Sequence, residues 1–159
     1  MKDTRGLTLL EIMVALAVSG ILLFAGASAA GKYGKKEKSR YEAEQIVGSL
    51  WELRSKATLG MRNPCLDFPD SATVRLYRDT STSADGFGAG DELLREYRMK
   101  GGVKVLAISG GRGATHSICF ESRGISGSAA GGLEVTLGSD NAITRKVRLL
   151  PSTGIAKVM

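Results

Sequence analysis

Residues 5–31 have the sequence RGLTLLEIMVALAVSGILLFAGASAAG, and the organisation of the rest of the chain depends on this stretch. After Glu11 no charged side chain occurs until Lys32, so residues 12–31 form a run of 20 uncharged residues. About 20 apolar residues in an α-helix cover the ~30 Å hydrocarbon core of a bilayer. Such a segment spans a membrane, is removed as a signal, or packs against other copies of itself.

Two ordinary interpretations of this stretch leave one feature unexplained. A secretory signal peptide fits the basic start, the apolar centre, and the small residues Ala25-Gly26-Ala27 and Ala27-Ser28-Ala29. Glu11 argues against it, because a charge deep in lipid costs roughly 2.5–3.5 kcal/mol and usually has a functional partner. A plain membrane anchor allows Glu11 to lie near the headgroups. Neither interpretation explains why Gly6 directly precedes Leu-Thr-Leu-Leu-Glu.

The string from Gly6 to Glu11 resembles the type IV prepilin signature, in which a short basic leader ends in Gly. A hydrophobic residue, Thr, two apolar residues and Glu then follow, as they do here. The resemblance implies that a prepilin peptidase cleaves between Gly6 and Leu7 on the cytoplasmic face and that Leu7 is N-methylated. Leu7 replaces the commoner Phe, a mild departure. Residues 1–6 are then a leader peptide, and residues 7–31 are a retained transmembrane and filament-core helix.

The same resemblance gives Glu11 a role in assembly. Helices of this family pack into an apolar filament core, where a buried carboxylate needs a cation or a hydrogen-bond donor. The family pattern implies that the amino terminus of the same or a neighbouring subunit supplies it. Glu11 is therefore expected to set the axial register of the subunit.

A basic cluster follows the apolar run directly. It contains four lysines and one carboxylate: Lys32, Lys35, Lys36, Lys38 and Glu37. The prepilin resemblance places this cluster on the periplasmic side. The chain therefore departs from the positive-inside rule, by which Lys and Arg are concentrated on the cytoplasmic side of a membrane segment. Lys2 and Arg5 in the leader lie on the cytoplasmic side, but the balance of charge between the two sides does not decide the orientation.

An amphipathic pattern continues the helix over residues 32–60. Apolar residues recur at steps of three and four along one face, from Ala43 through Ile46, Val47, Leu50 and Leu53 to Ala57. Charged residues, Glu42 among them, are expected mostly on other faces. Gly60 is the predicted stop, so one helix from about residue 7 to residue 59 would be ~80 Å long. Bends or local melting are expected at Gly20, Gly26, Gly31 and Gly34.

Residues 61–159 are predicted to form a β-rich globular domain. The 21 glycines against three prolines indicate many tight turns. Six or seven short strands are expected, at about 73–78, 93–98, 102–108, 117–120, 133–137 and 142–150, with a last one after Gly154. The fold class is therefore α+β and pilin-like, with one long N-terminal helix packed on a small antiparallel β-sheet domain.

The last forty residues resemble minor pilins of the GspH/FimT type, in which a Phe-x-x-x-Gly turn precedes two final strands. Phe120 and Gly124 match this turn, and Thr153-Gly154 matches the closing element. The resemblance implies a minor pseudopilin of a type II secretion system; the alternative is a minor pilin of a type IV pilus. Some FimT relatives take up DNA through arginines around the closing glycine, which this chain lacks. The basic strand Arg145, Lys146 and Arg148 is a weak candidate for anion or DNA contact, but no aromatic residues interleave with it.

Other candidate sites have simpler interpretations. His116 is the only histidine, which makes a metal site or a catalytic triad improbable. Ser109-Gly110-Gly111-Arg112-Gly113 lacks the Lys-Ser/Thr of a phosphate loop and is predicted to be a turn. Cys65 and Cys119 either form a disulfide, stable in an exported domain, or are two buried thiols.

The sequence thus predicts a non-enzymatic subunit with no catalytic residues, cofactor or metal. Its expected partners are a prepilin peptidase, other pilins or pseudopilins in a hetero-oligomeric filament, and the inner membrane, with nucleic acid not expected. The expected location is the inner membrane, crossed once, with the globular domain in the periplasm. The formal charge of +6 indicates a solvated basic surface. A periplasmic enzyme or binding protein on a signal anchor is the alternative from another functional class.

Overall fold

The computed structural model describes residues 9–80, 87–111, 116–121, 132–139, 144–150 and 153–159, without the side chains of residues 28–32 and 35. By its contacts the chain divides into two units, residues 1–35 and residues 36–159. The second unit contains the C-terminal part of the helix together with all the strands.

A single helix, α1 (Leu9–Thr58), occupies the first third of the chain. Its bounds agree with the predicted helix to within two residues at each end. It passes through Gly20, Gly26, Gly31 and Gly34 without a break, so the expected local melting does not occur. Favourable flanking residues in the helix therefore outweigh the modest cost of isolated glycines.

Gly60 ends the helix as predicted. Its φ of 98° lies in the left-handed region, which glycine enters without steric cost. The Gly60 amide donates to the Ala57 carbonyl at 3.1 Å, and the Met61 amide donates to the Lys56 carbonyl at 3.0 Å. This pair of bonds is a Schellman motif, which satisfies carbonyls that the helix end leaves without partners.

The described residues of the second unit contain eight strands in two antiparallel sheets. The first sheet has the order β3-β2-β1-β5, with bounds β3 (Glu92–Arg98), β2 (Thr73–Arg78), β1 (Pro64–Asp70) and β5 (Ile118–Cys119). The second has the order β4-β6-β7-β8, with bounds β4 (Lys104–Gly110), β6 (Leu133–Gly138), β7 (Thr144–Leu150) and β8 (Ile155–Val158). The predicted α+β architecture is confirmed, whereas the division into two sheets was not predicted.

The first strand, β1, was missed by the sequence analysis. Pro64 and Pro69 argue against a strand, because proline cannot donate to a sheet ladder. Here Pro64 is the first residue of the strand and Pro69 comes at its irregular end, between the register positions of Asp67 and Asp70. The five residues from Pro64 to Phe68 are buried, and β1 pairs with β2 on one side and β5 on the other.

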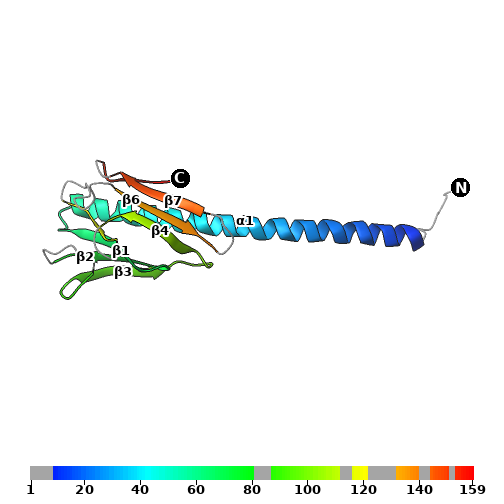
Figure 1. Ribbon diagram of the computed structural model, residues 1–159, viewed down its shortest axis with the longest axis horizontal. Helices are drawn as coiled ribbons and strands as arrows, with labels where there is room; N and C mark the ends of the chain where they lie inside the picture. The colour runs from blue at the N-terminus through cyan, green and yellow to red at the C-terminus, as the bar shows by residue number, and fades with distance from the viewer. Residues whose placement is uncertain (1–8, 81–86, 112–115, 122–131, 140–143, 151–152) are drawn as a thin grey trace. The chain divides into compact units, whose positions relative to one another are not determined.

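One hydrophobic core joins the helix to both sheets. Figure 1 shows the strands of both sheets beside the cyan part of α1. The predicted stripe of Ala43, Ile46, Leu50, Leu53 and Ala57 is buried, as expected, and Val47 packs partly buried at its edge. The core is completed by side chains of both sheets, which are Leu66, Phe68, Val74, Leu76, Ile118, Phe120, Leu133, Val135, Leu137, Val147, Leu149 and Ala156.

Glu42 departs from the predicted amphipathic pattern, because its side chain is buried with only 2% exposed. Its Oε1 accepts a hydrogen bond of 3.0 Å from the Lys100 amide, at the turn between β3 and β4. This hydrogen bond holds the turn between β3 and β4 against α1. Its donor, Lys100, is remote in sequence from Glu42. Helical periodicity alone could not predict it.

Candidate functional site

The apolar N-terminal part of α1 is the first candidate site. Residues Leu9–Ala27 form a 19-residue stretch that is long and apolar enough to cross a membrane, and none of it is buried. Large side chains such as Phe24, 81% exposed, and Leu9, 78% exposed, have no covering partner within the described chain. An exposed apolar surface of this kind requires lipid or other helices to cover it.

Glu11 is exposed in the first turn of this helix. A carboxylate is favoured there because the helix dipole places partial positive charge at the N-terminus. The predicted cleavage and methylation residues, Gly6 and Leu7, lie outside the described residues. The proposed contact between Glu11 and an amino terminus therefore stays a prediction.

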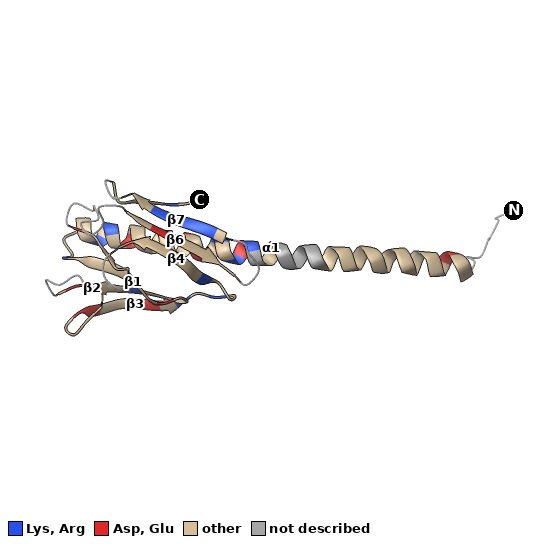
Figure 2. Cartoon of the chain, in the orientation of Figure 1, with Lys and Arg blue, Asp and Glu red and all other residues tan. Residues whose placement is uncertain are grey.

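The basic strand β7 is the second candidate, and its three cations do not converge. Lys146 and Arg148 lie on the exposed face of the strand, whereas Arg145 alternates to the other face and is half-buried. Figure 2 shows blue basic positions along β7 and a red acidic position on the neighbouring β6.

That carboxylate, Glu134, partly neutralises the exposed face of β7. Its Oε1 lies 2.8 Å from Lys146 Nζ, and its Oε2 lies 3.7 Å from Arg148 Nε. The hydrogen bond from Lys146 lowers the pKa of the Glu134 carboxyl below its usual value. Lys157 pairs opposite Arg148 and adds a third cation to this face, which only the strand pairing brings into position.

The two cysteines form a disulfide bond. Cys65 on β1 and Cys119 on β5 are direct partners across the first sheet. Asp79 is the third member of this cluster, with a carboxylate oxygen within 4.8 Å of both sulfurs. Because the sulfurs are bonded to each other, they are not available as thiolate ligands, and the cluster does not form a metal site.

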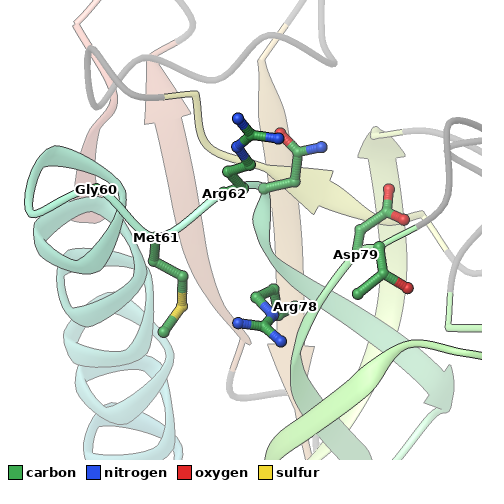
Figure 3. Close-up of a pocket in the computed structure, with 7 residues that line it drawn as sticks. Gly60, Met61, Arg62, Arg78 and Asp79 are labelled. Carbon is green, nitrogen blue, oxygen red and sulfur yellow. The ribbon is translucent and has the colours of Figure 1, made fainter.

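A pocket of about 580 Å³ lies where the end of α1 approaches β2. Figure 3 shows Arg78 between Met61 and Asp79, with Gly60 and Arg62 in the segment that follows the helix. Arg78 is already paired, because its Nη2 lies 2.6 Å from Glu92 Oε2. The pocket was not predicted, and its lining contains neither a histidine nor a cysteine.

His116 contacts the backbone of the glycine-rich turn. Its Nδ1 lies 3.0 Å from the Gly110 carbonyl oxygen, and its backbone has a φ of 51°. Gly110 and Gly111 also have positive φ, as a glycine-rich turn requires. In the tail, Gly124 lies outside the described residues, whereas Gly154 forms a turn before β8, with its amide 2.8 Å from the Leu150 carbonyl.

Asp67 is a buried carboxylate that the sequence analysis did not identify. Its Oδ2 accepts a 3.3 Å hydrogen bond from the Phe87 amide and lies 3.9 Å from Arg75 Nη1. Oδ1 is buried without a hydrogen-bond partner. Burial raises the pKa of the Asp67 carboxyl, and the Phe87 amide and Arg75 oppose that shift. The group anchors Phe87, whose ring stacks on Arg75 and meets Tyr77 edge-on.

Comparisons with known proteins agree with the N-terminal motif and the fold. Residues 1–27 match the family model of the prokaryotic N-terminal methylation motif. The structure is similar to the minor pseudopilin EpsH from the type 2 secretion system of Vibrio cholerae, with a TM-score of 0.57 and 11% identity, over 77% of this chain and 96% of that one. It is equally similar to the type IV minor pilin FimU of Pseudomonas aeruginosa, with a TM-score of 0.57 and 12% identity, over 80% of this chain and 92% of FimU.

The comparison with curated protein sequences gives no match. The methylation motif covers the amino terminus alone, and the structural similarity at this low identity concerns the fold. The chain therefore carries the N-terminal methylation motif of type IV prepilins on the pilin-like fold of minor pseudopilins and minor pilins.

Proposed function

We propose that the chain is a minor pilin-like subunit that is anchored in the inner membrane by its N-terminal helix and then assembled into a filament. The observation that carries this proposal is the combination of a methylation motif at residues 1–27 with a pilin-like fold in one chain. The exposed apolar segment Leu9–Ala27 supports it, because both a bilayer and a bundle of helices would cover such a surface.

Processing is the first step of the proposed pathway. A prepilin peptidase removes residues 1–6 by cutting after Gly6, and Leu7 becomes the methylated amino terminus. The globular unit then faces the periplasm, and Glu11 sets the subunit's register through an amino terminus in the filament.

Mass spectrometry of the mature protein tests this pathway. The chain should begin at N-methylated Leu7 when it is expressed with a prepilin peptidase, and a Gly6→Leu variant should keep its leader. A mature chain beginning near Ala30 would instead indicate signal-peptide removal and overturn the proposal.

Within this class, we infer a minor pseudopilin of a type II secretion system. The similarity to EpsH and the GspH/FimT-like tail support this assignment. The equal similarity to FimU keeps the type IV pilus minor pilin as the alternative.

Deletion of the gene in its natural host separates the two machines. Loss of protein secretion with intact pili supports the pseudopilin assignment. Loss of pili with normal secretion supports the alternative. Catalytic activity is not part of either proposal.

A further inference from the structure

The outer side of the last two strands, β7 and β8, carries charge that the fold does not use. Val147, Leu149 and Ala156 are buried in the core, so the residues that alternate with them lie on the outer side of these strands. Figure 2 shows the basic positions along β7. We call the following set the ribbon face: Lys146, Arg148 and Leu150 of β7, Ile155 and Lys157 of β8, and Met159 directly after β8.

Two cations of the ribbon face stand directly opposite each other. Arg148 and Lys157 are register partners across β7 and β8. The Cβ atoms of such partners are about 4.5–5.5 Å apart, and like charges in this position destabilise a sheet. The pairing therefore opposes the stability of the fold, and a partner that supplies negative charge would relieve the repulsion.

The nearby carboxylate of Glu134 does not neutralise the ribbon face. Glu134 is the register partner of Arg148 on β6, and it is shared between Lys146 Nζ at 2.8 Å and Arg148 Nε at 3.7 Å. Lys157 is exposed and makes no ion pair with any residue that the structure describes. Three cations thus face one carboxylate, which leaves a side-chain charge of three minus one, or +2.

Apolar side chains flank the two opposed cations. Leu150, which is 39% exposed, is the register partner of the half-buried Ile155. On the other side Met159, which is 55% exposed, exchanges backbone hydrogen bonds of 2.7 and 3.2 Å with Lys146. A cationic centre between apolar side chains is complementary to a carboxylate that has apolar neighbours of its own, as on a protein surface. The ribbon face suits a nucleic acid less well, because none of its side chains is an aromatic ring on which bases could stack.

We propose that the ribbon face binds an acidic surface of a neighbouring pilin-like subunit, with a carboxylate of that subunit placed between Arg148 and Lys157. The inference rests on the proposed function, which supplies the neighbour. A carboxylate in this position replaces one repulsion with two attractions. Glu134 approaches Arg148 through Nε, so the Nη atoms of the guanidinium remain for a second carboxylate. Leu150 and Met159 exclude water at the rim of the contact.

Photocrosslinking in the natural host tests the proposal. p-Benzoylphenylalanine replaces Met159, where it keeps the position apolar, and as a matched control it replaces Leu93 on β3, which is 50% exposed. Peptide mass spectrometry of filaments from irradiated cells then maps the crosslinked residues. Position 159 should crosslink to a pilin-like subunit close to an aspartate or glutamate. Its yield should fall about threefold in Lys157→Gln and in Arg148→Gln, whereas the yield from position 93 should not change. Lys104→Gln, which removes an exposed cation of β4, should leave both yields unchanged.

Stability and charge exchange distinguish this contact from a structural role. Lys157→Gln removes a like-charge pair, so its midpoint of urea denaturation should not fall below that of the natural chain although its crosslink is reduced. Arg148→Glu/Lys157→Glu should reduce the crosslink about tenfold or more. A change of the crosslinked carboxylate of the neighbour to lysine should restore it, because the two charges are then exchanged.

The opposite outcomes separate the inference from the proposed function. A crosslink that these charge changes leave unaffected overturns the inference, as does a mapped segment without a carboxylate. A crosslinked species that nuclease digestion removes also overturns it, because the partner is then a nucleic acid. A chain that is incorporated into filaments but gives no crosslink from position 159 overturns the inference alone. Absence of the natural chain from filaments contradicts the proposed function itself, and the inference with it.

Discussion

Single carboxylates carry much of the chemistry in this chain. Glu11 lies in an otherwise uncharged apolar run, in the first turn of α1, where the helix dipole favours a negative charge. Glu42 and Asp67 are buried inside the globular unit, and each accepts a hydrogen bond from a backbone amide of a segment that is distant in sequence. The first serves the proposed assembly, whereas the other two serve the fold.

The role of Glu11 predicts a defect that is confined to assembly. Glu11→Ala should insert into the membrane and be cleaved after Gly6, because neither step requires the carboxylate. It should be incorporated into filaments at least tenfold less efficiently, because the amino terminus loses its partner. Quantitative blotting of sheared filaments against the membrane fraction measures this, with Met13→Ala on the same exposed helix as the control. Normal incorporation of Glu11→Ala would remove the register role.

The burial of Asp67 predicts a pH dependence of stability with a defined sign. Burial raises its folded-state pKa above the ordinary value of 3.8, so its contribution to stability is fully present below that pH and is lost as the pH rises through the folded-state pKa. Asp67→Asn retains an acceptor for the Phe87 amide but does not titrate. Relative to this variant, the natural chain should therefore lose unfolding free energy as the pH increases above 3.8.

Urea denaturation at a series of pH values from 3.5 to 7 measures this difference. Glu96→Gln, which changes the exposed carboxylate on the other side of Arg75, serves as the control and should have a smaller effect. Parallel pH profiles for the natural chain and Asp67→Asn would contradict the prediction.

At the scale of elements, the end of α1 depends on a glycine, and the link between β1 and β5 depends on a disulfide bond. Gly60 supplies the left-handed conformation of the Schellman motif. The disulfide between Cys65 and Cys119 connects the short β5 to β1, its neighbour in the first sheet.

Two glycines of the same helix region should respond to alanine with opposite signs. Gly60→Ala places a Cβ at a φ of 98° and should destabilise the protein by about 1 kcal/mol. Gly48 lies within α1, and a Cβ there would meet nothing within 4 Å. Gly48→Ala should therefore stabilise it by roughly 0.5–1 kcal/mol. Thermal denaturation of both variants provides the comparison, and a destabilised Gly48→Ala would indicate that the glycine has a further role.

The disulfide should contribute substantially to stability. Cys65 and Cys119 are 54 residues apart, and the chain-entropy model gives about 4 kcal/mol for closing a loop of this size. The double variant Cys65→Ala/Cys119→Ala should therefore unfold at a lower urea concentration than the oxidised natural chain. Reductant should lower the midpoint of the natural chain toward that of the variant and leave the variant unchanged. A natural chain insensitive to reductant would contradict this estimate.

At the scale of the whole molecule, net charge is a poor guide to partners. The formal charge is +6, yet the exposed cations of β7 share Glu134, and Arg145 lies on the other face of the strand. The exposed face of β7 is therefore partly neutralised, which weakens its attraction for a phosphate backbone.

We accordingly expect weak binding of DNA. The full chain in detergent should not retard a DNA duplex at physiological salt, and Lys146→Gln/Arg148→Gln should behave in the same way. Glu134→Gln removes the opposing charge and should be the first variant to shift the duplex as salt is lowered. Binding by the natural chain that the double variant abolishes would instead favour the DNA-uptake alternative.

The sequence by itself determined the N-terminal motif, the extent of α1, its stop at Gly60 and the buried stripe from Ala43 to Ala57. These features depend on local patterns, namely residue spacing, helical periodicity and the conformational preference of glycine. The β2 strand, at Thr73–Arg78, was likewise evident from its alternation.

The tertiary structure alone decided what depends on contacts between distant segments. It made a strand of Pro64–Asp70, where proline argued against one, because pairing with β2 and β5 and burial outweigh that preference. It divided the strands into two sheets, bonded Cys65 to Cys119, and buried Glu42 and Asp67. Sequence periodicity defines which side of an element is apolar, whereas only the packed chain defines what each side meets.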